Sequence, residues 1–158
     1  MAVRICRMRS AMNVNQAAYH DLCCYTLTHG DPAFIHQYVV DAFAAQDANE
    51  GDKPIRITFA LIGLYLHVER GFTGRQVQLA HMKLARQKRQ WPVLQIPANR
   101  GEISAATVLA TEPGAERDEL IHQWTVSVWQ AFAVNQPEIE RLLQEHGISG
   151  VHSVRWTR

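Results

Sequence analysis

The chain has 158 residues, of which 47% are hydrophobic and 20% are charged. Such a composition supplies enough apolar mass for one folded domain and excludes intrinsic disorder, which requires low hydrophobicity and a large charge imbalance. The 16 basic residues nearly cancel the 15 acidic ones, and this balance argues against a general polyanion-binding surface.

Residues 1–12 are basic and lack a continuous apolar run, so we expect an N-terminal extension and not a secretory signal. The longest apolar stretch, 57–68, is too short and too mixed to span a bilayer. Only three cysteines occur, and Cys23 and Cys24 are adjacent, which is not the pattern of a disulfide framework. We therefore expect a cytoplasmic protein with reduced thiols and no membrane partner.

Four helices are predicted in the first part of the chain, over 15–29, 31–47, 54–70 and 74–90. Asp31 and Thr73 are good N-caps for the second and fourth of them. Pro54 suits a first helical position, and Gly71 can end a helix in the left-handed conformation. The helix at 54–70 is apolar almost all round, so it should be the central buried one.

The remaining elements are a linker at 92–102, a short helix at 104–111, a long helix at 115–134 and a last helix that ends before Gly147. The linker is apolar for a loop, so we expect it to lie along the helices. Short connections between the first four helices favour antiparallel neighbours. The predicted fold is therefore all-α: an antiparallel helical bundle with a four-helix core and C-terminal helices packed across it. It forms a single domain over 13–147, followed by a tail at 148–158.

Histidine is the one compositional oddity, with eight in the chain. His20 and Cys24 lie one turn apart on the first helix, His36 lies early in the second, and His81 lies midway along the fourth. Side chains from facing helices of a bundle can converge on one metal ion, and imidazole and thiolate suit zinc, nickel or iron. The sequence thus predicts a divalent metal held by His20, Cys24, His36 and His81. Asp41 or Glu69 would orient a ligating imidazole.

Other interpretations remain open, because the chain lacks HExxH, ExxH and paired CxxC motifs. A buried histidine is more often a hydrogen-bonded core residue than a ligand. A nucleophilic set of Cys24, His36 and Asp41 has no local sequence signature. In the main alternative the protein is a non-catalytic interaction module, whose basic face at 75–89 meets an acidic partner. Nucleic-acid binding through that face is a weaker hypothesis, given the near-zero net charge. The partner would be a small molecule or a protein, and a homodimer is compatible with the sequence.

Two long strings carry a family resemblance: YHDLCCYTLTHGDPAFIHQYVVDAFAAQ at 19–46 and LIGLYLHVERGFTGRQVQLAHMKLA at 61–85. They resemble a bacterial family of small proteins known only as a domain of unknown function, number 5946, over about 19–129. The family pattern H…VDA…AQ corresponds to His36, Val40, Asp41, Ala42, Ala45 and Gln46, and its HM pair to His81 and Met82. The resemblance therefore gives more weight to His20, His36 and His81 than to His67.

Some relatives that share only the H…VDA…AQ part carry an N-terminal CPxC motif and a histidine after AQ. Here the N-terminus offers only Cys6, and Asp47 follows the AQ pair. A bundle with inward histidines is also the layout of DinB-like metalloenzymes, which is an analogy of fold alone. Hydrolysis or thiol transfer would be the reactions to test if a metal with an open coordination position is bound. Whether the protein is an enzyme is left open by the sequence.

Overall fold

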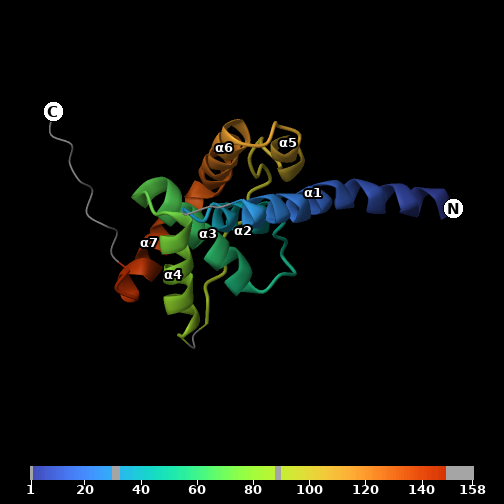
Figure 1. Cartoon of the computed structure of the whole chain (residues 1–158). Coiled ribbons are helices and arrows are strands. Elements are labelled where there is room, and N and C mark those ends of the chain that lie inside the picture. Colours follow the sequence, from blue (N-terminus) through green and yellow to red (C-terminus); the bar gives the residue numbers. More distant parts are fainter. Residues whose placement is uncertain (1, 30–32, 88–89, 149–158) are drawn as a thin grey trace.

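The computed structural model describes residues 2–29, 33–87 and 90–148, with side chains from Val14 onward. All regular structure in these residues is helical, which confirms the predicted all-α fold (Figure 1). The helices are α1 (Ala2–Thr28), α2 (His36–Gln46), α3 (Pro54–Arg70), α4 (Gly74–Ala85), α5 (Ala105–Leu109), α6 (Ala115–Phe132) and α7 (Gln136–Glu145), with a 3₁₀ turn at Ala133–Asn135. Within the described part of the chain, no helix is sufficiently long and apolar to cross a membrane.

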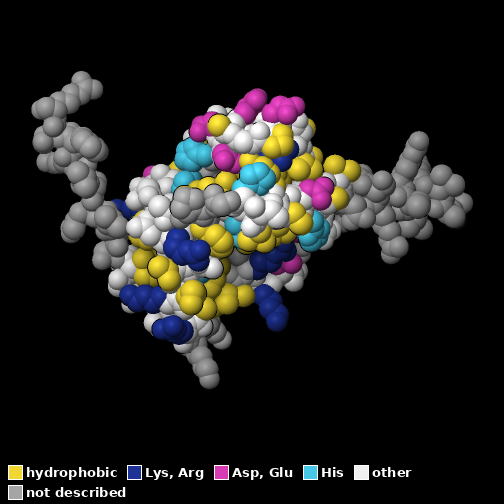
Figure 2. Space-filling model, viewed as in Figure 1, with side chains coloured by type: hydrophobic (Ala, Val, Ile, Leu, Met, Phe, Trp, Pro, Cys, Tyr) yellow, Lys and Arg dark blue, Asp and Glu magenta, His cyan; other side chains and the backbone are white. Residues whose placement is uncertain are grey.

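Charge is distributed unevenly over the surface. In the space-filling view, acidic side chains gather over α5 and α6 at one end of the molecule (Figure 2). Lysine and arginine side chains gather around α4 on the same view, with hydrophobic side chains between them. On this face of the molecule, acidic and basic side chains are therefore largely separated.

Helix ends follow the capping signals of the sequence. Pro54 begins α3, and Gly71 ends it with a φ of 69° in the left-handed region. Thr73 forms a capping box with Gln76 at the start of α4. The hydroxyl of Ser104 accepts from the backbone N–H of Thr107 at the start of α5. Each of these ends lies where the sequence predicts it.

The second helix begins later than predicted, at His36. The expected cap residues Asp31 and Pro32 lie outside the described residues. Phe34 has a φ of 58°, and its carbonyl oxygen is 1.8 Å from the position that a Cβ on Gly74 would take. The backbone N–H of Arg75 donates to the carbonyl of Ala33 at 3.3 Å. The segment before α2 is thus held against the start of α4, and this contact between distant residues replaces the expected first turn.

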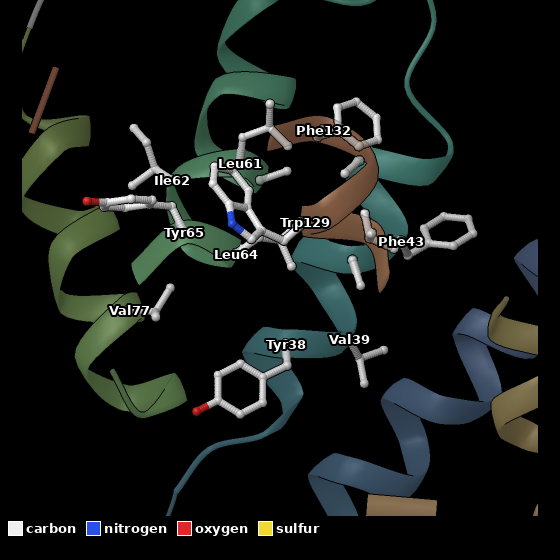
Figure 3. Packing of buried hydrophobic residues seen from close by; sticks show 14 of the residues in the cluster. Tyr38, Val39, Phe43, Leu61, Ile62, Leu64, Tyr65, Val77, Trp129 and Phe132 are labelled. Atoms are coloured by element: carbon white, nitrogen blue, oxygen red, sulfur yellow. The ribbon is translucent and has the colours of Figure 1, made fainter. Parts of the chain in front are cut away.

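The core lies where α2, α3 and α6 pack on one another, and α4 covers part of it. Figure 3 shows Leu61 and Leu64 of α3 beside Trp129 of α6, whereas Phe43 of α2 points to the other side. Trp124, Trp129 and Phe132 of α6 are almost fully buried there. Helix α6 is therefore part of the centre of the bundle, whereas α1 packs at the side of the bundle against α2 and α5.

The linker before α5 lies along the helices, as its apolar composition predicts. Leu94 is buried, and Gln46 at the end of α2 holds the distal part of the linker. The Gln46 amide donates to the carbonyls of Arg100 at 3.2 Å and Ile103 at 2.7 Å, and its oxygen accepts from the indole of Trp124 at 2.9 Å. One amide side chain at the end of α2 thus joins the linker to α6.

Candidate functional site

Four helices contribute to a cleft of about 500 Å³. Its lining residues come from α1 (Gln16, Tyr19, His20), α2 and the residue after it (Gln37, Val40, Asp41, Phe43, Ala44, Asp47), α3 (Arg56, Phe59, Ala60) and α4 (His81). Three of the residues predicted for a site, His20, Asp41 and His81, therefore line one cavity although they come from three helices.

Asp41 lies at the floor of this cleft with only 4% of its surface exposed. Its Oδ1 atom accepts a hydrogen bond from the Gln37 amide at 3.1 Å, whereas its Oδ2 atom is buried without a hydrogen-bond partner. Burial raises the pKa of Asp41 well above its usual value, and the Gln37 hydrogen bond only partly opposes that shift. The raised pKa favours the protonated, neutral form of this carboxyl.

Gly63 of α3 makes room for this carboxyl. A Cβ at Gly63 would lie 1.9 Å from Oδ2 of Asp41 and 3.2 Å from Cε1 of His81. The absence of a side chain in an otherwise apolar helix therefore lets α2 bring its carboxyl close to the backbone of α3. The carboxyl of Asp41 and the imidazole of His81 therefore both lie close to the position that a side chain on Gly63 would occupy.

His81 contributes a neutral imidazole with one nitrogen already occupied. Its Nε2 lies 2.9 Å from the carbonyl oxygen of Phe59, so Nε2 carries the proton and donates it. Burial lowers the pKa of His81 to about 4, with the Phe59 hydrogen bond acting in the opposite direction. Nδ1 is then an acceptor, and its nearest polar group is the Gln37 amide at 3.4 Å.

The mouth of the cleft combines charged and aromatic groups. Arg56 pairs with Asp47 at 3.1 Å and with Asp52 at 2.8 Å. The ring of Tyr19 stacks on Phe43 with centroids 4.1 Å apart. Burial, together with a hydrogen bond to Cys23, raises the pKa of Tyr19 to about 12, so its phenol stays protonated. The rim thus offers a flat aromatic wall beside a paired guanidinium.

Three further predicted site residues lie elsewhere. Cys24 is exposed on α1 and is not part of the cleft lining. Nδ1 of His36 lies 2.9 Å from the hydroxyl of Thr26, on the side of α2 that faces α1. Glu69 accepts a hydrogen bond from the indole of Trp129 at 2.8 Å. These three residues hold local structure together or face solvent, and they do not gather around His81.

A metal centre needs at least three ligating groups at one point. In residues 14–29, 33–87 and 90–148, no group of three histidine, cysteine, aspartate or glutamate side chains has that arrangement. His20 and His81 share the cleft, and Nε2 of His81 lies against the carbonyl oxygen of Phe59. Among the described residues, His81 is therefore held by hydrogen bonding and does not belong to a ready-made group of three ligands.

A second histidine pair lies outside the cleft. Nδ1 of His67 is 3.1 Å from the carbonyl of Phe72, and its Nε2 is 2.9 Å from Nδ1 of His122 on α6. The ring of His67 also stacks on Tyr38 at 3.7 Å. Burial lowers the pKa of His67 to about 4. This imidazole joins α3 to α2 and α6, which is a structural role.

A second hollow of about 690 Å³ lies between the α2–α3 turn and the linker. It is lined by Asn49, Glu50, Asp52, Pro54, Ile57, Val93, Leu94, Gln95 and Ile96. It is larger than the four-helix cleft, but it contains no histidine or cysteine and no buried orphan polar atom. The smaller cleft is therefore the better candidate site, because it concentrates the perturbed titratable groups.

Sequence reasoning did not identify Gln37, Tyr19 or Gly63. Gln37 lies four residues before Asp41, so it shares the inward face of α2, and that spacing is a usable signal. A lone glycine in the apolar helix at 54–70 was the other available signal, since glycine in a helix interior often marks a close approach. The position of Tyr19 depends on how α1 packs against α2, which no local pattern specifies.

Residues 14–133 match DUF5946, described as a family of unknown function, and the chain therefore belongs to that family. No curated protein and no solved structure matches the chain. The matched range begins in α1 and ends just after α6, so it contains every residue of the four-helix cleft.

Proposed function

We propose that this member of the family binds a small organic molecule in the four-helix cleft, with Asp41 present as a neutral carboxylic acid. The observation that carries this proposal is that Asp41 lines the cleft while its Oδ2 atom is buried without a hydrogen-bond partner. An unsatisfied buried polar group costs about 1–3 kcal/mol. Such costs are typical of functional sites, where a ligand can supply the missing partner.

The hydrogen-bonding pattern of the floor specifies the chemistry of the ligand. Because Oδ1 of Asp41 accepts from Gln37, the proton of the acid belongs on Oδ2, which is then a donor. Nδ1 of His81 is an acceptor, because Nε2 donates to Phe59. A ligand with an acceptor beside a donor, such as a primary amide or a lactam, matches both groups, and its donor would take the place of the 3.4 Å Gln37 contact at Nδ1. Since both protein groups are neutral, an uncharged ligand suits this floor best.

A divalent metal ion is the second candidate, because His20, Asp41 and His81 line the same cleft. Zinc, nickel or iron would require the His81 ring to give up the Phe59 carbonyl or to use Nδ1. The metal content of protein purified without a histidine tag tests this function. About one equivalent of metal that is lost in a His20→Ala/His81→Ala variant would support it. Protein that is purified without metal, and whose melting temperature is unchanged by added zinc, would exclude metal binding.

A fragment screen by ligand-detected NMR tests the main proposal, with amide and lactam fragments compared against carboxylates and amines. We expect neutral amide-type fragments to bind and to shift the backbone signals of Gln37, Asp41 and His81. Asp41→Leu should weaken their binding by about tenfold or more, because the donor is lost. Asp41→Asn keeps a donor and should keep part of the affinity.

Glu116→Gln, an exposed change on α6 and outside the cleft lining, is the matched control and should leave binding unchanged. The proposal fails if no fragment shifts the three cleft residues. It also fails if fragments bind the Asp41→Leu variant as tightly as they bind the original chain.

A further inference from the structure

The outer face of α4 differs from the rest of the surface in both charge and exposure. Residues 71–101 contain six basic residues and no aspartate or glutamate. Leu79 and Met82, on α4, are 56% and 51% exposed, although large apolar side chains are usually covered. In Figure 2 hydrophobic and basic side chains lie side by side over this helix.

The apolar and basic side chains form one stripe. Arg75, Leu79, Met82 and Arg86 follow one another at spacings of four, three and four residues, which places them on a single helix face. The opposite face carries Val77, Ala80 and Leu84, which are buried in the core. The stripe is therefore the side of α4 that faces away from the protein, with two apolar residues flanked by an arginine at each end.

The charges of the stripe have no acidic partner among the residues that the structure describes. The guanidinium of Arg75 lies over the ring of Phe34 at 4.5 Å and donates to Gln78. Among the described residues, no carboxylate pairs with Arg75, Lys83 or Arg86. The face thus keeps its full positive charge available to another molecule.

We propose that the outer face of α4 binds an acidic amphipathic helix of a partner protein. The four–three–four spacing is that of the apolar seam of a two-helix coiled coil, so Leu79 and Met82 would pack into a partner helix. Acidic residues that flank the partner's apolar positions would meet Arg75 and Arg86. This interaction is separate from the four-helix cleft, because none of the four stripe residues lines that cleft.

Other occupants fit this stripe less well. A second copy of the chain would place Arg75 against Arg86 in an antiparallel pair, or against its own counterpart in a parallel pair, and like charges would oppose both. A nucleic acid would present phosphates to Leu79 and Met82, which would gain little from that contact.

Fluorescence anisotropy with the full chain and a labelled designed peptide tests this proposal. The probe is a 21-residue helical peptide with leucine at its seam positions and glutamate beside them. The same peptide with lysine in place of glutamate, and one with glutamine in place of leucine, are the comparison probes. We expect only the acidic leucine peptide to bind, with an affinity that falls as the salt concentration rises.

Leu79→Gln and Met82→Gln should each weaken binding of the acidic peptide by about tenfold. An Arg75→Glu/Arg86→Glu variant should lose the acidic peptide and gain the lysine peptide. Leu27→Gln, which changes an equally exposed apolar residue on α1, is the control and should bind as the original chain does. NMR spectra of each variant confirm that the fold is kept.

Equal binding of the acidic and basic peptides would overturn the proposal, as would an unchanged affinity in the Leu79→Gln and Met82→Gln variants. Binding of a DNA duplex more tightly than the acidic peptide, with no dependence on Leu79, would assign the face to nucleic acid and would also overturn it.

Discussion

Asp41 combines two properties that are rare together in a folded protein: it is a buried carboxyl, and one of its oxygens has no partner. Gly63 makes this arrangement sterically acceptable, because any larger residue would meet the carboxyl. The position of the Asp41 carboxyl at the floor of the cleft therefore depends on the glycine at position 63.

Gly63→Ala tests this steric relation. In a helix alanine is normally the more stable residue by about 1 kcal/mol. Here its Cβ would collide with Oδ2 of Asp41, so we expect a loss of about 1–3 kcal/mol in the free energy of unfolding, measured with urea. In an Asp41→Ala background the collision is absent, and the same substitution should be neutral or stabilising. An equal loss in both backgrounds would show that the two residues do not interact.

Asp41→Asn tests the protonation of the acid through the pH dependence of stability. The pKa of Asp41 is raised in the folded protein above about 3.9 in the unfolded chain. The folded protein therefore holds the Asp41 proton more tightly than the unfolded chain does. The resulting stabilisation of the fold is complete at low pH and is lost as the pH rises through the folded pKa. We expect Asp41→Asn to gain stability relative to the original chain between pH 4 and pH 7.

The comparison with Asp41→Asn is needed because two histidines act in the opposite direction. The pKa values of His67 and His81 are about 4 in the fold and 6.5 without it, so their contribution is present above pH 6.5 and is lost as the pH falls toward 4. Asp21→Asn, an exposed change on α1 outside the cleft lining, provides the control for an ordinary loss of charge. A difference between the Asp41→Asn variant and the original chain that stays constant from pH 4 to pH 7 would contradict a neutral Asp41.

At the residue level, the sequence predicted part of the candidate site. His20, Asp41 and His81 do reach one cavity, with Asp41 buried, His81 partly buried and His20 exposed. His36 is on α2 as well, but it lies five residues before Asp41, and its ring reaches Thr26 of α1 instead. Cys24 has the expected spacing from His20 but lies one turn further along α1, outside the cleft lining. The spacing of residues along a helix specifies which face they share. It does not specify the point along the helix at which neighbouring helices cross.

Among the helices, local capping signals account for most of the predicted boundaries. Pro54, Gly71 and Thr73 specify ends of α3 and α4 through backbone geometry that is independent of the rest of the fold. Three predicted boundaries were wrong: α1 begins at Ala2 instead of 15, and α4 ends at Ala85 instead of 90. The third is the start of α2, which lies at His36 because Ala33 and Phe34 make their contacts with Gly74 and Arg75. Such a contact joins residues about forty positions apart, and no local pattern contains it.

Thr73→Ala tests the contribution of the α4 cap. The substitution removes the acceptor for the backbone N–H of Gln76, so we expect a loss of about 1 kcal/mol in the free energy of unfolding. Thr73→Ser keeps the hydroxyl and should restore most of the stability. Urea unfolding of both variants provides the measurement, and equal stability of the alanine and serine variants would show that the capping box is not formed.

For the whole molecule, α7 is an integral part of the fold although it lies beyond the range that matches the family. Ile139, Leu142 and Leu143 are buried, and Glu140 accepts a hydrogen bond from Tyr65 of α3 at 3.0 Å. The helix therefore completes the side of the core formed by α3 and the end of α6.

Removal of α7 tests its role in the fold. A chain that ends at Asn135 loses three buried aliphatic side chains, each worth about 1.5–3 kcal/mol. We expect it to unfold or to melt at a much lower temperature than a chain that ends at Ile148, so that the two differ mainly by α7. Circular dichroism during heating measures the difference, and coincident melting curves would contradict a shared core.

The molecule as a whole places its two candidate sites on opposite sides of α4. The inward face carries His81 into the cleft, and the outward face carries the exposed stripe of Arg75, Leu79, Met82 and Arg86. Both assignments depend on the packing of α4 against α2 and α3.

The central claim is that packing of the helices holds Asp41 as a neutral acid at the floor of the cleft. A pH titration of the side-chain carboxyl carbons by ¹³C NMR, with the Asp41 signal assigned from the Asp41→Asn variant, tests this claim most directly. We expect the Asp41 signal to keep the chemical shift of a protonated carboxyl at pH 7, because burial raises its pKa. An Asp41 signal with the chemical shift of a deprotonated carboxylate at pH 7 would contradict the account.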